Sequence, residues 1–426
     1  MSYHNFIYMN TGELYGFGEN INGQLGLGHN RSVDSLILLM IDFEIKQIIC
    51  GFNFSMLLKN NGELWVFGCN DYGQLGLGHK FEVLVPTLLM VDPEIKQVVC
   101  GHDHSVILKN NNDILVFGSN ICGQLGLPYD VSYRIPRVLN NSIITNKNIK
   151  IKEIICGMHH TMIHYMDGTI VVFGDNQYGQ LGVNKYMDEE IYEEKCEDEQ
   201  LLMELTFDFK SKVKKIICGR YHTLMLTENN DLFGFGFNCY YQLGLGDEKS
   251  RFIPTLLMNK NIKQMSCGGD HNMILTHDNE LFVFGFNDYN QCGISNTTKK
   301  NSHVELPELL VKDNSINYVL CGFNHSIIIK ENCELLVCGI NASLGLGFDN
   351  DHKSILKPLI KNSNIIGVNG CRFGHIKWQT NLYSKLSKKT QHVIFAFLLV
   401  CRYYRIKYNV NMVKYMKHEV IKYLFY

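Results

Sequence analysis

The stretch Phe67–Gly78 reads FGCNDYGQLGLG and carries four glycines. A close copy, FGENINGQLGLG, occupies Phe17–Gly28, fifty residues earlier. The Phe-Gly or Cys-Gly pair that opens the stretch recurs along the chain at intervals of 49 to 62 residues. Its glycines are Gly18, Gly68, Gly118, Gly174, Gly236, Gly285 and Gly339. A regular period of this length is typical of repeat proteins, and it divides the chain into seven units.

Each unit also has a second part that is repeated along the chain. IKQIICGFNFSMLLKNNGELWVFG (Ile45–Gly68) is matched by IKQVVCGHDHSVILKNNNDILVFG (Ile95–Gly118), with weaker copies starting at Ile151, Val213, Ile262 and Ile316. Short apolar runs separated by Asn-Gly or Asn-Asn turns predict antiparallel strands joined by hairpins. Three or four strands per unit, repeated seven times, indicate propeller blades rather than helical repeats.

The two ends of the chain carry complementary halves of one unit. Residues 4–18, HNFIYMNTGELYGFG, align with the back half of a unit. The front half occurs in degraded form as NIIGVNGCRFG, Asn364–Gly374. We therefore expect one blade to combine strands from both termini, which leaves no open sheet edge in the ring.

With its G-x-N-x-x-G-Q-L-G-L-G and C-G-x-x-H-[ST] turns, the chain resembles the regulator of chromosome condensation (RCC1-type) repeat family over about residues 1–378. The resemblance implies an all-β fold, a seven-bladed RCC1-type β-propeller closed by strands from both termini. A short α-helical tail, residues 379–426, is expected to follow it. The recurring pairs of WD-type and kelch propellers are missing from the sequence.

The Gly-Gln-Leu-Gly-Leu-Gly turn is predicted to be scaffolding. Its glycines suit positive φ angles and close approach between blades. Asn20, Asn70 and Asn120 are suited to hydrogen-bonding the turn backbone, and Gln24 and Gln74 to satisfying a buried loop. A phosphate-cradling loop is the alternative, but it needs a following helix and a Lys-Ser/Thr pair, and the sequence has neither.

Cysteine and histidine recur at fixed repeat positions. The cysteines are Cys50, Cys100, Cys156, Cys218, Cys267 and Cys321. We expect them in the core, since ligands from six blades lie too far apart for a tetrahedral metal site; no metal or cofactor is expected. The histidines are His104, His160, His222, His271 and His325, with Phe54 at the first copy. They are expected to make structural hydrogen bonds. No catalytic triad or carboxylate pair recurs, so we expect a protein that is not an enzyme.

Two residues in each C-G-x-x-H turn vary while their surroundings are constant. They are Phe52, Asn53, His102, Asp103, Met158, His159, Arg220, Tyr221, Gly269, Asp270, Phe323 and Asn324. Equivalent turns of a propeller lie on one face around the axis. Aromatic, charged and polar variation in a fixed frame predicts a protein-binding loop face. Ordinary loop drift is the alternative interpretation.

Composition sets broad limits on partners and compartment. The chain has 426 residues and a formal net charge of −2, which gives no signal for nucleic-acid binding. Its first residues, MSYHNFIYMN, do not resemble a secretory signal, so we expect an intracellular protein, in cytoplasm or nucleus. The acidic run MDEEIYEEKCEDEQ, residues 187–200, is expected to be a solvated loop or to attract a basic partner.

The tail differs from the repeats in composition. Residues 379–426 hold nine Lys/Arg against one acid, Glu419. The uncharged stretch Val393–Cys401 would span about 13 Å as a helix, too short for a bilayer core of about 30 Å. The residues expected to make tail interactions are Arg402, Arg405, Val413, Met416, Val420 and Leu424. The tail loosely resembles F-box-like adaptors that recruit ubiquitin-ligase subunits; capping of the ring and binding to anionic membranes are alternatives.

Two functions follow as hypotheses. The first is a non-enzymatic scaffold that binds a protein on the loop face, a substrate receptor if the tail recruits ubiquitin-ligase subunits. The alternative, implied by the family's founding member, is a guanine-nucleotide exchange factor for a Ran-type small GTPase. For that activity the candidate contacts are Asp103, Asp270 and His325. The sequence does not decide which partner binds.

Overall fold

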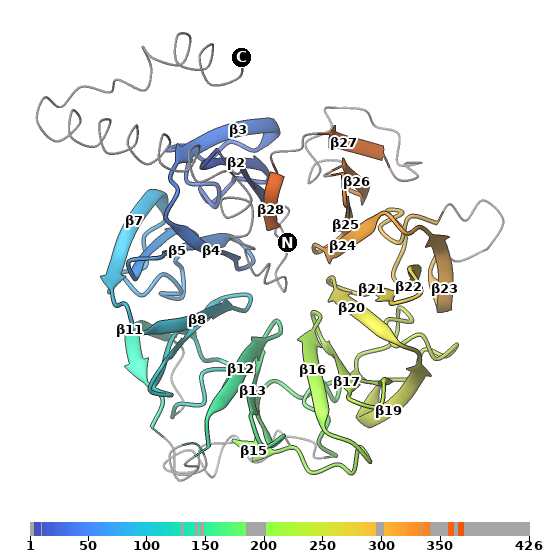
Figure 1. Ribbon diagram of the computed structural model, residues 1–426. Helices are drawn as coiled ribbons and strands as arrows, with labels where there is room; N and C mark the ends of the chain where they lie inside the picture. The colour runs from blue at the N-terminus through green and yellow to red at the C-terminus, as the bar shows by residue number, and fades with distance from the viewer. Residues whose placement is uncertain are drawn as a thin grey trace, which may run out of the picture. The chain divides into compact units, whose positions relative to one another are not determined.

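The structure is a computed structural model of the chain (Figure 1). It describes residues 4–9, 11–128, 132–140, 144, 149–184, 202–294, 302–332, 334–340, 357–361 and 365–369. The chain divides into two units, Met1–Lys377 and Trp378–Tyr426, and every described residue belongs to the first. The acidic run 187–200 and all predicted tail residues lie outside the described residues, so those expectations stay predictions.

Seven four-stranded antiparallel sheets form the blades of a propeller, as predicted. Blade 1 is β28-β1-β2-β3, and blades 2 to 7 follow in chain order from β4 to β27. The strands nearest the axis are β28 (Ile365–Asn369), β4 (Ile45–Cys50), β8 (Ile95–Cys100), β12 (Ile151–Cys156), β16 (Val213–Cys218), β20 (Ile262–Cys267) and β24 (Ile316–Cys321). The second strands are β1 (His4–Met9), β5 (Phe54–Lys59), β9 (His104–Lys109), β13 (His160–Tyr165), β17 (His222–Thr227), β21 (His271–Thr276) and β25 (His325–Lys330).

The outer half of each blade has two more strands. The third strands are β2 (Glu13–Gly18), β6 (Glu63–Gly68), β10 (Ile114–Ser119), β14 (Ile170–Gly174), β18 (Asp231–Gly236), β22 (Glu280–Gly285) and β26 (Glu334–Gly339). The outermost are β3 (Val33–Ile41), β7 (Val83–Val91), β11 (Ser132–Val138), β15 (Met203–Glu204), β19 (Arg251–Asn259), β23 (Val304–Lys312) and β27 (Lys357–Lys361). Five of these seven edge strands contain a proline, which removes a backbone donor and opposes pairing with another chain.

Blade 1 combines strands from both ends of the chain, as the sequence predicts. β28 pairs with β1 in an antiparallel register that places Ile7 opposite Val368 and Tyr8 opposite Gly367. Figure 1 shows the orange β28 beside the blue strands of the N-terminal blade. The first and last repeats of the propeller therefore share one sheet.

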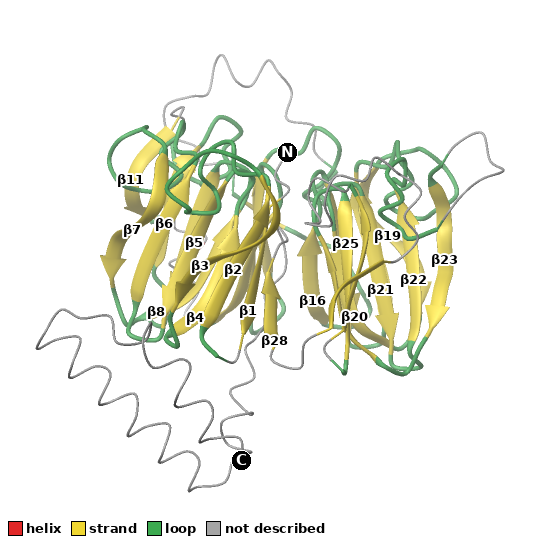
Figure 2. Ribbon diagram, turned by 90° about the horizontal axis from the view of Figure 1, so that it is seen from above, coloured by secondary structure: helices red, strands yellow, loops and turns green. Residues whose placement is uncertain are grey.

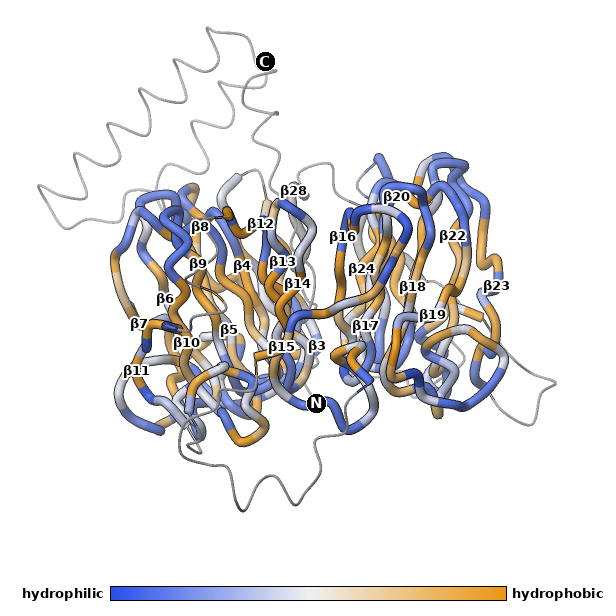
Figure 3. Tube along the Cα trace, turned by 90° about the horizontal axis from the view of Figure 1, so that it is seen from below, coloured by the Kyte–Doolittle hydropathy of each residue, from blue (hydrophilic) through white to orange (hydrophobic). Residues whose placement is uncertain are grey.

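The core lies between the blades. The second strands, such as β5 and β9, are buried on both faces, because each packs against the blade before it and the blade after it. One hydrophobic cluster joins Met56 and Val66 of blade 2 to Val98 and Cys100 of blade 3. Figure 3 shows the consequence in hydropathy, with orange strands ending in blue turns. The six repeat cysteines are all buried, which confirms that they belong to the core.

In blades 1 to 6, the described part of the loop between third and fourth strands is fixed by its own side chains. Asn20 Oδ1 accepts a hydrogen bond from the Leu25 amide at 2.8 Å, and its Nδ2 donates to the His29 carbonyl at 2.7 Å. Gln24 Oε1 accepts from the Asn22 amide at 2.9 Å. The predicted scaffolding roles of the Asn and Gln positions are confirmed.

Glycine allows this loop to touch the next blade. Gly73 has a φ of +76°, and a Cβ there would lie 2.6 Å from Arg134 Cα on strand β11 of blade 3. Only glycine fits so close to another backbone, because real Cβ atoms do not approach to that distance. At Gly123 the φ is similar, +71°, but a Cβ would have no atom of the described chain within 4 Å.

We predict that Gly73→Ala destabilises the protein more than Gly123→Ala. In both variants, a side chain at positive φ destabilises the folded state by about 1 kcal/mol. Only Gly73→Ala also causes overpacking between blades, which costs about 1–3 kcal/mol more. Urea unfolding of the two variants and the wild type measures the difference. Equal losses of stability would show that the contact between blades 2 and 3 is not tight.

A ring of histidine hydrogen bonds links the blades near the axis. In each bond, the histidine is the first residue of the second strand of its blade. Its Nε2 is hydrogen-bonded to the side chain of the residue at position two of the second strand in the next blade. The six bonds are His4–Ser55 (2.8 Å), His104–Thr161 (3.1 Å), His160–Thr223 (3.3 Å), His222–Asn272 (2.9 Å), His271–Ser326 (2.8 Å) and His325–Asn5 (2.9 Å). The expected structural role of the histidines is confirmed, and His325 closes the ring onto blade 1.

The acceptors in this ring determine which histidine nitrogen carries the proton. Ser326 Oγ donates its own proton to the Gln291 carbonyl at 2.7 Å, and Asn272 Nδ2 donates to the Gln242 carbonyl at 2.8 Å. The remaining oxygen lone pairs can only accept, so each histidine carries a proton on Nε2. The one junction without a histidine is at Phe54, where Ser105 still donates to the Gln74 carbonyl at 2.8 Å.

Burial keeps four of these histidines neutral at mildly acidic pH, because it lowers their pKa values. It lowers the pKa of His222 and His325 to about 4, and with neighbouring histidines it lowers the pKa of His4 and His271 to about 3. Between these values and the unfolded pKa of about 6.5, the unfolded chain binds more protons than the folded chain. Stability is therefore full above pH ~6.5 and falls as the pH decreases, by about 1.4 kcal/mol per pH unit for each histidine.

We predict that His271→Phe is tolerated better than His222→Phe. The first variant recreates the Phe54–Ser105 junction, because Ser326 keeps its bond to Gln291. The second leaves the buried Asn272 Oδ1 without its donor, at an added cost of about 1–3 kcal/mol. Urea unfolding at pH 7.5 and pH 5 measures the loss of unfolding free energy and the slope of this free energy against pH. We expect the slope to decrease by the equivalent of about one proton in each variant. An unchanged slope would mean that these histidines are protonated in the folded protein.

Candidate functional site on the loop face

The variable turns and the glycine-rich loops lie at the same end of the propeller. Because neighbouring strands are antiparallel, the turn after each inner strand and the loop after each third strand both occur at this end, which we call the loop face. Figure 2 shows the longer green loops at this end and short turns at the other.

A belt of backbone hydrogen bonds connects the turns around the axis. The first variable residue of one turn donates its amide proton to the carbonyl of the equivalent residue in the next blade. The five bonds are Phe52–His102 (3.4 Å), His102–Met158 (3.1 Å), Met158–Arg220 (3.2 Å), Arg220–Gly269 (2.9 Å) and Gly269–Phe323 (3.0 Å). The structure thus brings the predicted site residues of blades 2 to 7 together.

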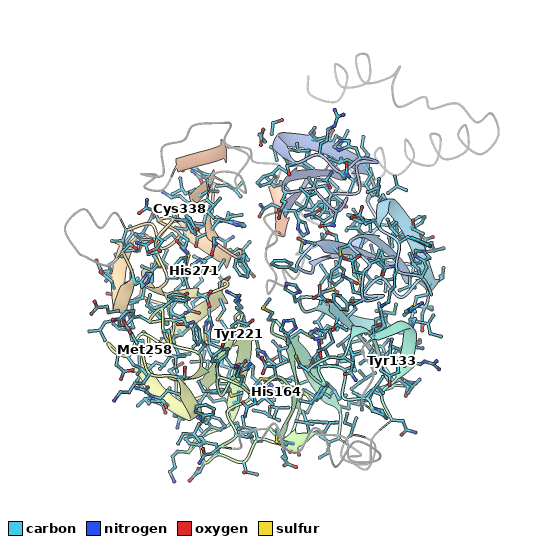
Figure 4. The ribbon with its side chains drawn as sticks, turned by 180° about the vertical axis from the view of Figure 1, so that it is seen from behind. Tyr133, His164, Tyr221, Met258, His271 and Cys338 are labelled. Atoms are coloured by element: carbon cyan, nitrogen blue, oxygen red, sulfur yellow. The ribbon has the colours of Figure 1, made fainter. Side chains whose placement is uncertain are left out.

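Side chains from distant blades meet above this belt. Phe52 stacks on His102 with ring centroids 3.9 Å apart and lies edge-on to Phe323 at 5.9 Å. The Arg220 guanidinium lies 5.6 Å from the Phe323 ring and 4.8 Å from the Tyr221 ring, within range of a cation–π interaction. We call these five residues the axial cluster. Figure 4 shows Tyr221 at the inner margin of the ring and Met258, of β19, at its periphery.

Gly269 allows Phe323 of blade 7 to reach Arg220 of blade 5. A Cβ at Gly269 would lie 2.9 Å from the Phe323 carbonyl oxygen and 3.2 Å from its ring. The missing side chain in blade 6 therefore leaves room for a contact between blades that are not neighbours.

Burial divides the predicted residues into two groups. Phe52, Met158, Asp270, Phe323 and Asn324 are buried, with at most 9% of their surface exposed. The half-buried residues are Asn53, His102, Asp103, His159, Arg220 and Tyr221. The second group supplies most of the accessible surface at these turns, and their binding of a partner stays a prediction.

Charges at the turns are largely compensated. Arg220 lies 3.7 Å from the Asp270 carboxylate, which also accepts a hydrogen bond from Gln242 Nε2 at 3.2 Å. His102 Nδ1 contacts the carboxylate of Asp103. The surface is therefore aromatic and polar rather than strongly charged.

An aromatic strip extends the axial cluster over blades 4 to 6. Starting at Tyr221, successive ring centroids lie 4.7 to 5.8 Å apart through Tyr178, Phe237, Tyr240, Phe286 and Tyr289. Tyr240 and Tyr289 are 37% and 38% exposed. This strip was not predicted from the sequence. Its signal is the FGFN sequence, in which Phe follows the repeat glycine in blades 5 and 6 and in no other unit.

The titratable groups beneath this face are poorly suited to catalysis at neutral pH. Burial raises the pKa of Cys50 and Cys321 to about 12, so these thiols stay protonated. His325 is fully buried and bonded to Asn5, so its side chain is not presented to a partner. Within the described ranges, no group of three or more His, Cys, Asp or Glu residues is placed to hold a metal ion.

The same ranges contain no helix that is both long and apolar enough to cross a bilayer.

Comparison with known proteins places the chain among relatives of this architecture. A segment of 124 residues, 29% of the chain, is 32% identical to the human probable E3 ubiquitin-protein ligase HERC4 and spans 10% of it. Another of 108 residues, 25% of the chain, is 29% identical to the human RCC1-like G exchanging factor-like protein and spans 22% of it. These relatives are matched over only part of their length.

Solved structures agree on the fold. Prp20p from Saccharomyces cerevisiae, whose crystal structure was described with its binding properties to Gsp1p and histones, superposes with a TM-score of 0.72. That match has 21% sequence identity and covers 92% of this chain and 96% of the other. The family model of the RCC1-like domain matches residues 13–374. The chain therefore belongs to the RCC1-like domain family.

Proposed function

We propose that the protein is a non-enzymatic interaction protein that binds a partner protein on the loop face of blades 4 to 6. The aromatic strip is the observation that supports this most. Its rings are held by contacts with each other, so Tyr240 and Tyr289 offer apolar surface with little conformational entropy left to lose on binding. Tyr, Phe and Arg are enriched in protein interfaces and supply many of their strongest contacts.

Among the described residues, the strip occupies one sector of the ring. Phe237 and Phe286 follow the repeat glycine in blades 5 and 6, whereas Cys69 and Ser119 occupy this position in blades 2 and 3. Repeats that share a scaffold but differ on one sector favour a single, oriented partner over seven equivalent sites.

A more specific role is that of a substrate receptor, in which residues 379–426 recruit ubiquitin-ligase subunits. The weak F-box-like resemblance of the tail supports it, together with the partial similarity to HERC4, named as a probable E3 ubiquitin-protein ligase. In this role the loop face selects the substrate and the tail supplies the connection to the ligase.

The second candidate is guanine-nucleotide exchange on a Ran-type small GTPase. The similarity to a G exchanging factor-like protein and the fold shared with Prp20p favour it. Of the three expected contacts, Asp103 is half-buried, Asp270 is paired with Arg220, and His325 is fully buried. His325 therefore acts in this chain by closing the propeller.

We predict that the double variant Tyr240→Ala/Tyr289→Ala loses its partner while remaining folded. Each truncation removes an exposed ring from the strip, and a central aromatic contact contributes about 2 kcal/mol or more to binding. Affinity purification with mass spectrometry compares the wild type, this variant and Phe43→Ala, which removes a half-exposed ring between strands β3 and β4 at the other end. A partner retained by the double variant would contradict binding at the strip.

Two further comparisons separate the specific roles. Ubiquitin-ligase subunits recovered with the full chain but not with residues 1–378 would support the substrate-receptor role. Nucleotide release from a Ran-type GTPase should be unaffected by the protein; acceleration that is lost in Asp103→Asn would favour exchange activity instead.

A further inference from the structure

A ring of lysines occupies the opposite end of the inner strands. Each inner strand begins with an apolar residue followed, in blades 2 to 6, by lysine: Lys46, Lys96, Lys152, Lys214 and Lys263. Blade 7 has Asn317 there. We call these five residues the lysine ring. They lie four residues before the repeat cysteine, about 13 Å from the loop-face end of the strand.

A β-bulge directs each of these side chains. The register between first and second strands shifts between Ile45 and Gln47, so Lys46 is the extra, unpaired residue. The same shift occurs at the equivalent position in blades 3 to 7. A bulge bends the strand and re-aims the side chain of its extra residue. Its repetition places the lysines at one level around the axis.

The lysine ammonium groups reach across to the next inner strand. Four of them donate to a backbone carbonyl near its start: Lys46 to Ile95 (3.1 Å), Lys96 to Ile151 (2.6 Å), Lys152 to Lys214 (2.7 Å) and Lys263 to Ile316 (3.4 Å). An ammonium group has three donors, so each of these lysines has two left for a ligand.

Lysines outside this ring form the ion pairs with aspartates at this end of the blades. Lysines at the ends of the second strands pair with aspartates, as in Lys59–Asp42 (2.9 Å) and Lys109–Asp92 (2.7 Å). No ion pair among the described residues involves a member of the lysine ring. The acid on the described inner strands is Glu153, whose carboxylate lies 3.4 Å from His164 and whose charge also acts on Lys215.

Additional lysines strengthen the positive charge in blades 4 and 5. Lys150 and Lys212 flank Lys152 and Lys214 in the sequence, and both are exposed. Desolvation and the charge of Lys150 lower the pKa of Lys96, as expected where cations are crowded. An anion bound among them would relieve this repulsion.

We propose that the lysine ring binds a compact polyanion carrying several phosphate groups. The cations surround the axis at one level instead of following a line, which suits a small, multiply charged molecule better than an extended strand. Lysine binds phosphate as a mobile point charge and needs no fixed bidentate geometry. This site lies at the other end of the propeller from the proposed partner surface and does not depend on it.

Isothermal titration calorimetry with myo-inositol hexakisphosphate tests the proposal on the full chain. We expect binding that weakens as salt is raised, and an affinity reduced about tenfold or more in Lys152→Gln/Lys214→Gln. Lys249→Gln removes one exposed lysine charge from a loop-face loop at the other end and should alter the affinity less than about twofold. Thermal melts verify that both variants are folded.

Three results would overturn the proposal: no binding by the wild type, an unchanged affinity in the double variant, or an equal loss in Lys249→Gln. A duplex DNA that binds more tightly than the hexakisphosphate would also overturn it, since the ligand would then be nucleic acid. Lysine acetylation of the wild type gives a test that needs no variant. The hexakisphosphate should protect Lys152 and Lys214 and leave Lys249 reactive; equal labelling with and without it contradicts the site.

Discussion

Contact between neighbouring blades is the constraint on which the structure depends. A blade buries its apolar faces only against the blades on either side, and near the axis each junction is joined by hydrogen bonds between buried polar groups. The bond from His325 to Asn5 joins residues 320 positions apart and closes this series. Glycines such as Gly73 permit the close approach, and buried neutral histidines provide the donors.

This frame determines where variation is possible. Repeat positions that carry Gly, His, Gln or Cys are fixed by buried contacts, so differences between units occur in the turns and loops at the two ends of the blades. At the loop face they form the axial cluster and the aromatic strip. At the other end the same bulge repeats, and the lysines it directs give that face a different chemistry. The two ends thus offer separate surfaces for separate ligands.

The repeat pattern predicted the blades, the closure by both termini, the buried cysteines and the structural histidines, because each depends on residues within one unit or on its copies. The exposure of the turn residues was not predictable in this way. Phe323 is buried since Gly269 leaves a gap between blades 5 and 7. The aromatic strip contains direct ring contacts between different blades, such as that of Tyr178 with Phe237. The role of His4 was not predicted, because no Cys-Gly pair precedes it in the first unit.

The most direct test of the central claim compares Ser326→Ala with Ser105→Ala by hydrogen exchange and mass spectrometry. Both variants lose a serine hydroxyl that donates to a glutamine carbonyl, but only Ser326 also accepts from a histidine. If histidine bonds couple the blades, Ser326→Ala should accelerate exchange in the inner and second strands of all seven blades, well beyond Ser105→Ala. Equal effects, or acceleration confined to blades 6 and 7, would contradict a ring held together by these bonds.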